Sequence, residues 1–278
     1  MKYAFCTCVQ IGMSCMEAIY KIGGDLSLII TLKDVKSQKK SGRIYVDTFA
    51  QENDIPVVKI NHVNDIESID AIRKFNIDWL FIIGWSQIAS TEVIETPKCG
   101  AIGAHPTLLP KGRGRASIPW AIIKGLDKTG ITFFKLDEGV DTGMILSQME
   151  IPLLQSETAT TLYQKVNYAH ESLIQDLYIG LEKNLIKGYS QNDEEATYWP
   201  GRKPMDGELN IYMSMDQVDK LVRGTTKPYP GAYIVTNGLK TIIWEGFKSL
   251  DQINNPMYQE IHLTDGFFYG TNFEMVKY

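Results

Sequence analysis

Gly100-Ala-Ile-Gly-Ala-His105-Pro-Thr-Leu-Leu-Pro-Lys-Gly-Arg-Gly-Arg115 is the stretch from which the rest of the chain is interpreted. Its small apolar residues predict a buried strand, and Pro106 biases His105 toward an extended conformation, so the strand should stop there. His105 would then lie at the carboxyl end of a strand, where open α/β sheets bind ligands. A single histidine is more often structural, but the Pro/Gly/Arg loop behind it and the Gly139-Val-Asp-Thr-Gly143 turn downstream favour a functional site.

The residues around this stretch alternate between short apolar runs and amphipathic segments, which predicts an α/β fold. Trp79-Leu-Phe-Ile-Ile83 is continuously apolar, as expected for a central parallel strand covered on both faces. The turn expected at 10–14 lacks Gly-x-Gly-x-x-Gly, so a dinucleotide is not indicated. We predict strands at 3–9, 26–31, 55–59, 79–83, 101–104, 129–135 and 144–151, and helices at 15–22, 44–53, 65–74, 118–124, 157–185 and 216–223.

The composition changes near residue 190, where a polar linker is followed by turn-rich sequence. Strand-like pieces then alternate with hairpin signals such as Asn237-Gly238 and Asp265-Gly266. We therefore predict a larger α/β domain over 1–190 and a small, mainly β domain over 191–278.

The whole-chain composition excludes several classes of protein. A net charge of −5 over 278 residues does not suggest binding to nucleic acid by bulk charge. No apolar run approaches the roughly 20 residues that span a bilayer, and no signal peptide is recognised, so we expect no membrane span and a cytoplasmic location. The 4 cysteines are interpreted as buried thiols rather than a metal or redox site. The basic loop at 33–43 is either solvated or a lip that closes over a phosphorylated ligand.

His105 and Asp141 both follow apolar strands at turns, so they could meet in one pocket although 36 positions separate them. A carboxylate beside an imidazole favours the protonated ring and fixes its tautomer. Such a pair could take a proton from an amine and stabilise a developing oxyanion. Asp141 could instead simply form the turn. Nucleophile-elbow, Walker and zinc-site patterns are not found in the sequence, so it supports neither covalent nor metal chemistry.

These motifs resemble the formyltransferases that use N10-formyltetrahydrofolate. The family pattern is Asn-x-His-(Pro/Gly)-Ser-Leu-Leu-Pro, an Arg-Gly loop, and Asp-x-Gly about 36 residues after the histidine. Gly103-Ala-His105-Pro-Thr-Leu-Leu-Pro110, Arg113-Gly-Arg-Ala116 and Asp141-Thr-Gly143 match it in this chain. Arg202-Lys-Pro-Met-Asp-Gly207 and Pro228-Tyr-Pro-Gly-Ala232 are similar to the C-terminal region of methionyl-tRNA and aminosugar formyltransferases.

The resemblance implies a Rossmann-like sheet with helices on both faces and a mechanism without a metal. His105 would stabilise the tetrahedral intermediate, and Asp141 would orient His105 and accept a proton. The residues implied to bind N10-formyltetrahydrofolate are Phe81, Ile83, Gly84, Trp85, Gln87, Leu136, Asp137 and Gly139. Those implied to contact the second substrate and its phosphates are Thr107, Lys111, Arg113 and Arg115.

The chain departs from the family at Gly103, where the pattern has asparagine. That asparagine is taken to hold the formyl oxygen, and loss of one such donor typically costs about 10²–10³ in rate. Three explanations stay open: Ser86, Gln87, Thr107 or a water supplies the bond, the glycine allows close approach of backbone, or the protein binds ligands without formylating them.

The preferred substrate is the amine of a nucleotide-linked amino-deoxy sugar, for surface glycan synthesis. A tRNA enzyme should carry a basic surface, whereas this chain is acidic, and its C-terminal part is not rich in lysine and arginine. A methionyl-tRNA formyltransferase-like enzyme and a catalytically weakened ligand-binding homologue are the alternatives. The β-rich tail is a reasonable homodimer surface.

Overall fold

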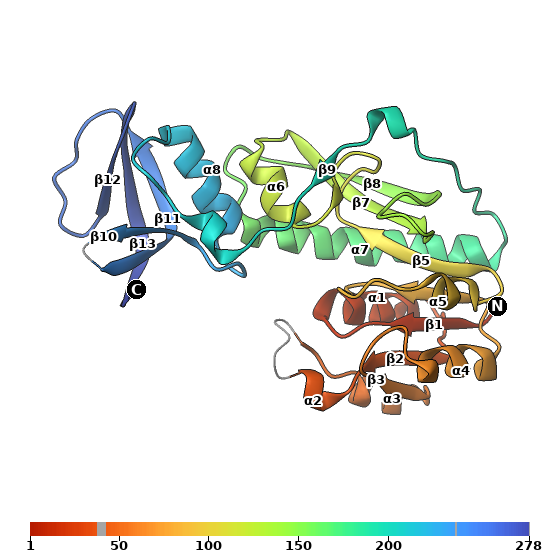
Figure 1. Cartoon of the computed structure of the whole chain (residues 1–278). Coiled ribbons are helices and arrows are strands. Elements are labelled where there is room, and N and C mark those ends of the chain that lie inside the picture. Colours follow the sequence, from red (N-terminus) through yellow and green to blue (C-terminus); the bar gives the residue numbers. More distant parts are fainter. Residues whose placement is uncertain (38–42, 237, 278) are drawn as a thin grey trace. The chain divides into compact units, whose positions relative to one another are not determined.

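The computed structural model describes residues 1–37, 43–236 and 238–277. The chain folds into two compact units, each assembled from three separate sequence segments (Figure 1). The first unit consists of Met1–Arg113, Gly130–Glu150 and Asn167–Thr197, and the second of Gly114–Thr129, Ile151–Val166 and Tyr198–Tyr278. The units are therefore interleaved along the chain, and the single boundary predicted at residue 190 stays a prediction.

A seven-stranded sheet forms the centre of the first unit, which confirms the α/β prediction. Its strands lie in the order β3-β2-β1-β4-β5-β7-β8. Neighbouring strands from β3 to β5 are parallel, and β7 runs antiparallel to β5. The strands are β1 (Tyr3–Cys6), β2 (Leu28–Leu32), β3 (Val57–Ile60), β4 (Trp79–Ile82), β5 (Gly100–His105), β7 (Lys128–Lys135) and β8 (Ile145–Pro152).

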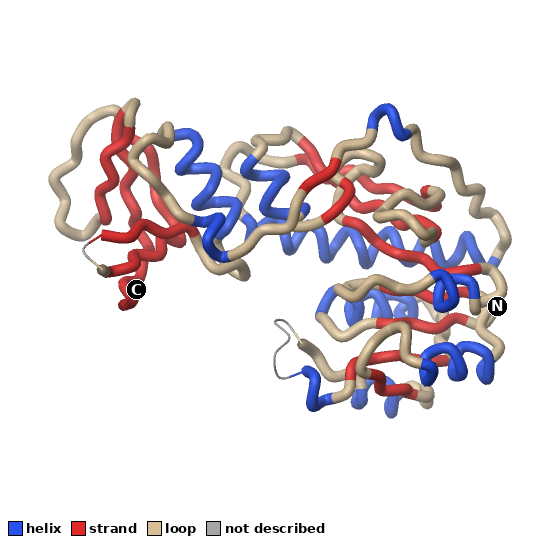
Figure 2. Tube along the Cα trace, viewed as in Figure 1, coloured by secondary structure: helices blue, strands red, loops and turns tan. Residues whose placement is uncertain are grey.

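Helices cover both faces of the sheet, and most of them connect its parallel strands (Figure 2). They are α1 (Gln10–Lys21), α2 (Asp34–Ser37), α3 (Asp47–Glu52), α4 (Ile66–Phe75), α5 (Thr91–Glu95) and α7 (Ala159–Glu182). The helix predicted at 65–74 is confirmed as α4, which begins after Asp65 and ends at Asn76 in a left-handed conformation.

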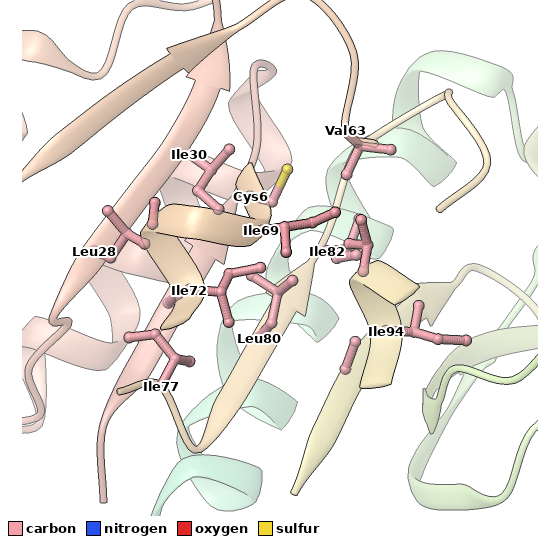
Figure 3. Close-up of a cluster of buried hydrophobic side chains, with 14 of the residues drawn as sticks. Cys6, Leu28, Ile30, Val63, Ile69, Ile72, Ile77, Leu80, Ile82 and Ile94 are labelled. Carbon is pink, nitrogen blue, oxygen red and sulfur yellow. The ribbon is translucent and has the colours of Figure 1, made fainter. Parts of the chain in front are cut away.

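Both faces of the sheet are covered, because successive residues of a strand point to opposite sides. Cys6 and Ile82 belong to an apolar cluster with Ile69 and Ile72 of α4 on one face (Figure 3). On the other face the ring of Tyr3 packs against Tyr178 of α7, with ring centroids 4.6 Å apart. This arrangement confirms the predicted sheet with helices on both faces.

The turn predicted at 10–14 is wrong, because these residues form the first turns of α1. Gly12 makes this possible: a Cβ there would lie 1.9 Å from Oγ1 of Thr7, so only glycine allows the helix to begin this close to the end of β1. The helix stop predicted at Gly23 is confirmed, and this residue has a φ of 78°.

The second unit contains a four-stranded sheet in the order β10-β11-β13-β12, which confirms the mainly β carboxyl-terminal part. Its neighbouring strands are antiparallel, and Asp265-Gly266 joins β12 to β13 as the hairpin signal predicts. Asn237 of the other signal and residues 38–42 of the predicted basic lip lie outside the described residues. The remaining elements are β6 (Arg113–Gly114), α6 (Ser117–Ile123), η1 (Asp193–Glu195), β9 (Tyr198–Trp199), η2 (Pro204–Gly207), α8 (Met215–Thr225), β10 (Ala232–Thr236), β11 (Leu239–Ser249), β12 (Gln259–Leu263) and β13 (Gly266–Lys277).

Among the described residues, the helices are all too short or too polar to cross a lipid bilayer. Cys6, Cys8 and Cys15 are buried and form no disulfide with one another, as expected, and Cys99 is half-buried. Burial raises the pKa of the Cys6 thiol well above its usual range, which keeps it protonated and unreactive.

Glu157 is a buried carboxylate in the second unit and gives a prediction for stability. Burial raises its pKa, but hydrogen bonds from Lys165 (2.5 Å) and Thr161 (2.5 Å) outweigh burial and leave the pKa below its usual value. A lowered pKa means that the carboxylate stabilises the fold above the unfolded-state pKa and loses this effect as the pH falls through the folded-state pKa. We expect Glu157→Gln to lower the free energy of unfolding by about 2 kcal/mol at pH 7.

The difference between wild type and Glu157→Gln should shrink as the pH falls below about 4.5. Urea unfolding at pH 7 and at pH 3.5 measures it, with the exposed Glu52→Gln as the matched control. A difference that stays constant over this range would contradict the assignment of Glu157 as a stabilising anion.

Candidate active site

His105 ends β5 and is 7% exposed, with a hydrogen-bond partner or charged neighbour at each ring nitrogen. Its Nε2 lies 2.8 Å from the carbonyl oxygen of Gly112, and its Nδ1 lies 3.5 Å from Oδ2 of Asp141. The two residues that the sequence pairs at a distance of 36 positions therefore meet in the structure. Asp141 is partly buried as well, with 18% of its side chain exposed.

These two contacts determine where the protons lie on the imidazole. The carbonyl of Gly112 can only accept, so Nε2 must carry a proton. If Nδ1 were unprotonated, its lone pair would face the Asp141 carboxylate, and the two would repel each other. The contact with Asp141 is favourable only when a second proton lies between Nδ1 and Oδ2. When the ring is protonated, its two N–H groups donate to the Gly112 carbonyl and to the Asp141 carboxylate.

The loop that carries Asp141 is shaped by its own polar side chains. Oδ1 of Asp137 accepts hydrogen bonds from the backbone N–H of Gly139 (3.1 Å) and the hydroxyl of Thr142 (2.7 Å), which forms a turn of the type that aspartate favours. Asp141 itself has a φ of 56°, a left-handed conformation that aspartate tolerates better than most residues. The turn that the sequence predicts is therefore present, and it also directs a carboxylate at His105.

A cavity of about 190 Å³ lies beside this pair, within the first unit. Most of its lining residues are apolar, and the side-chain polar groups among the described lining residues are the carboxylates of Asp137 and Asp141, the amide of Gln87 and the indole N–H of Trp85. Such a cavity suits a flat ring with a few polar atoms at its edge. The lining residues are Ile82, Trp85, Gln87, Ile88, Ala89, Ile94, Gly103, Ala104, Phe134, Leu136, Asp137, Gly139, Val140 and Asp141.

The lining contains five of the eight residues expected to bind the folate: Trp85, Gln87, Leu136, Asp137 and Gly139. Three others need correction. Phe81 faces the opposite side of the sheet, where its ring packs with Tyr3 and Phe5, and Ile82 takes its place at the cavity. Ile83 is 1% exposed and buried. Gly84 has a φ of 67°, and a Cβ there would lie 2.4 Å from Val9, so it serves close packing of the loop.

Gly103 shares the face of β5 from which His105 projects, because the two residues are two positions apart. A Cβ at Gly103 would lie 2.7 Å from Cδ2 of Leu136 and 3.3 Å from Phe134. The space that an asparagine side chain would need is therefore filled by a leucine. The side wall of the cavity next to His105 is apolar in this chain.

The side chains considered as replacements for that asparagine are hydrogen-bonded elsewhere, buried or exposed. Both ends of the Gln87 amide bind the neighbouring loop, with Oε1 accepting from the N–H of Val63 (2.8 Å) and Nε2 donating to the carbonyl of Asn61 (3.2 Å). The hydroxyl of Thr107 is buried and has no hydrogen-bond partner among the described residues. Ser86 is exposed. A water, the backbone or His105 itself is left for this role.

The four residues expected to contact the second substrate divide into two kinds. Lys111 and Arg115 are exposed cations, as a phosphate contact requires, whereas Thr107 is 2% exposed. Arg113 is corrected: it is 1% exposed, and its guanidinium binds Oε1 of Gln191 (2.8 Å) and Oδ1 of Asp193 (2.7 Å). A guanidinium paired inside the protein positions other residues rather than meeting a phosphate.

Sequence reasoning missed Gly112 and Gln191 at this site. Gly112 contributes its backbone carbonyl, which residue type does not reveal. Gln191 stands in a polar stretch that reads as a linker, yet its amide bonds Arg113 and the carbonyls of Asp141 and Gly143. A glutamine far along the chain carries no local signal for such a contact.

The chain is also similar to known proteins, which are enzymes of formyl transfer. The family profile described as "Formyl transferase" matches residues 14–177. The methionyl-tRNA formyltransferase of Clostridioides difficile (strain 630) is 35% identical over 255 residues, which cover 91% of this chain and 82% of that protein.

Two solved structures share the fold over nearly the whole chain. One is WlaRD, a sugar 3N-formyl transferase in the presence of dTDP and 5-N-formyl-THF, with a TM-score of 0.73, 20% identity, and coverage of 97% of this chain and 96% of that one. The other is the N-formyltransferase from Helicobacter canadensis in complex with folinic acid and dTDP-3-aminofucose, with a TM-score of 0.73, 20% identity, and coverage of 97% and 98%.

Proposed function

The chain belongs to the formyl transferase family, and from this premise we propose that it moves the formyl group of N10-formyltetrahydrofolate to the amine of a nucleotide-linked amino-deoxy sugar. The observation that carries the proposal is the contact of His105 with Asp141 beside an apolar cavity of about 190 Å³. The enzyme is an N-formyltransferase, and the sugar acceptor is the part that rests on likeness of fold.

The cavity fits the pterin ring of a folate. Trp85, Ile82 and Leu136 offer apolar walls, and Asp137 and Asp141 offer acceptors at the edge. The folate supplies the formyl carbon that an amine attacks. His105 and Asp141 are placed to stabilise the charge that develops on the formyl oxygen and to accept a proton.

His105 stabilises negative charge on the formyl oxygen through its protonated ring. In the protonated ring, one N–H is directed at the Gly112 carbonyl and the other at the Asp141 carboxylate. A small movement of the ring would redirect its Nε2–H from the Gly112 carbonyl to the oxyanion. The Nδ1–H stays with the Asp141 carboxylate. Asp141 would face the ring during this exchange and accept the proton that the amine loses as its nitrogen bonds to the formyl carbon. The bond from that carbon to N10 would then break, and N10 of the departing folate would take the proton.

Lys111 is the candidate for a phosphate contact that the first unit presents on its surface. Arg115, in the second unit, is an exposed cation that lies against Gly201 and stays a predicted phosphate contact. Arg113 no longer belongs to this group. We expect no metal in the reaction, because the carboxylate and imidazole already supply proton transfer and charge stabilisation.

A sugar acceptor is favoured by two observations. The chain matches two sugar N-formyltransferases over 97% of its length in fold. Its net charge of −5 also argues against a surface built to neutralise many phosphates of a tRNA.

A methionyl-tRNA acceptor is the second candidate, and most of the sequence relatives favour it. The relative with 35% identity over 91% of this chain is a methionyl-tRNA formyltransferase. Identity of this kind reflects the shared formyl-transfer core as well as the acceptor, so it does not separate the two candidates.

A direct acceptor assay tests the proposal. We expect incubation with N10-formyltetrahydrofolate and a panel of dTDP- and UDP-aminosugars to add one formyl group to one of them, detected by mass. The same preparation should leave methionyl-tRNA unformylated. Formylation of the tRNA with every sugar unchanged would transfer the assignment to the second candidate, and folate binding without any formyl product would show that the site only binds ligands.

A further inference from the structure

We infer that Gln191 is a positioning residue for His105, holding apart the two protein groups that bind the imidazole. The inference rests on the proposed function for its kinetic test, but its structural content concerns this chain's own side chains. Gln191 lies just before η1 and is half-buried in the first unit, 86 positions from His105 along the chain.

The amide of Gln191 makes four hydrogen bonds and has no capacity left. Oε1 accepts from Nε (3.0 Å) and Nη2 (2.8 Å) of Arg113, and Nε2 donates to the carbonyls of Asp141 (2.8 Å) and Gly143 (2.7 Å). Arginine can only donate and a carbonyl can only accept, so this orientation of the amide is the one that its partners allow.

These four bonds connect the two segments that flank His105. Gly112, whose carbonyl binds Nε2, directly precedes Arg113, and Asp141, whose carboxylate faces Nδ1, accepts a bond from Gln191 at its own backbone carbonyl. One side of the gap between the two segments is therefore spanned by the imidazole and the other by Gln191 with Arg113. The length of the Gln191–Arg113 connection sets the width available to the ring.

Further hydrogen bonds hold the backbone of Gly112 and Arg113 in place. The backbone N–H of Arg113 donates to the carbonyl of Thr197, and the N–H of Gly112 donates to the Thr197 hydroxyl (2.8 Å). The left-handed backbone of Asp141 also needs support, which the bond from Gln191 to its carbonyl gives. Loss of the Gln191 amide would free the Asp141 turn while the Gly112 side stayed fixed.

The central test is Gln191→Ala, which removes all four bonds. We expect kcat to fall by about 100-fold, because a displacement of Asp141 by about 1 Å is enough for an effect of that size. KM for the folate and for the acceptor should change little, since the Gln191 side chain is not among the described groups that line the cavity. Thermal unfolding of the variant shows whether the loss is simply one of folding.

Gln191→Glu separates the two halves of the connection. A carboxylate still accepts from the Arg113 guanidinium, so the buried charge keeps its partner and the variant should fold. It cannot donate to the carbonyls of Asp141 and Gly143, so kcat should fall about as far as in Gln191→Ala. Glu194→Gln, an exposed change in the same short helix as Asp193, is the matched control and should alter kcat by less than about twofold.

The second readout is the ¹⁵N spectrum of the His105 ring, assigned by its loss in His105→Asn. The wild-type ring should show both nitrogens protonated, whereas in Gln191→Ala, where Asp141 no longer faces Nδ1, the ring should be neutral and its nitrogens should average between tautomers. A purely structural role for Gln191 would not move these signals in a protein that is still folded.

The outcomes separate this inference from the proposed function. Wild-type kcat in Gln191→Glu, or an unchanged His105 spectrum in Gln191→Ala, would overturn the positioning role. If the wild-type protein formylates none of the acceptors, the proposed function fails, and the ring spectra of the two variants still decide the role of Gln191.

Discussion

Replacing His105 with asparagine is expected to lower kcat for formyl transfer by about a thousandfold. Asparagine can still donate to the carbonyl of Gly112, so the loop should keep its position. It cannot become a cation between Gly112 and Asp141 as an imidazole can, and it therefore loses the proposed stabilisation of the oxyanion. Single-turnover formation of the formylated sugar, followed by mass, measures the effect.

The matched control is His262→Asn in β12. This histidine lies on an exposed part of the second unit, with its Nε2 beside Glu260, and its loss should leave kcat unchanged. Formyl transfer by His105→Asn at more than a tenth of the wild-type rate would show that the roles given to His105 and Asp141 are wrong.

Restoring an asparagine at position 103 should help catalysis only when Leu136 is made smaller. In Gly103→Asn alone, the new Cβ would lie 2.7 Å from Cδ2 of Leu136, so the leucine must move into the cavity. We expect KM for the folate to rise by about tenfold and the fold to lose about 1–3 kcal/mol from overpacking. The double variant Gly103→Asn, Leu136→Ala has room for the amide.

In the double variant the amide lies on the same face of β5 as His105 and can donate to the formyl oxygen. We expect kcat about 100-fold above wild type, the magnitude typical of one added oxyanion donor. Leu136→Ala alone is the control and should show no gain in kcat. A double variant no faster than wild type would mean that another group already fills the role of the asparagine, since the effects of neighbouring residues are not additive.

The position of the catalytic pair could be predicted because its determinants are local. The apolar run before His105 and the proline after it place the histidine at a strand end, and both glycines around Asp141 mark a turn. The resemblance of both motifs to the formyltransferase pattern then indicated that His105 and Asp141 act together. The ring's second partner, the Gly112 carbonyl, could not be predicted, because a backbone group has no sequence signature.

The side of the β4 strand that faces the cavity could not be predicted. Trp79-Leu-Phe-Ile-Ile83 is apolar throughout, because this central strand is buried on both faces, so there is no alternation from which to choose between Phe81 and Ile82. Arg113 shows a different limit. A cation in a glycine-rich loop looks like a phosphate contact, and its burial depends on acceptors 78 and 80 positions away.

The interleaving of the two units restricts how this chain can be recombined with its relatives. A chimaera joined at residue 190 would take α8 without α6, although Gly224 of α8 packs so closely on α6 that a Cβ there would lie 2.9 Å from Ile123. A second unit grafted from another enzyme must therefore bring 114–129 and 151–166 with it. Transplanting only the tail would leave the host with a mismatched helix pair and an incomplete core.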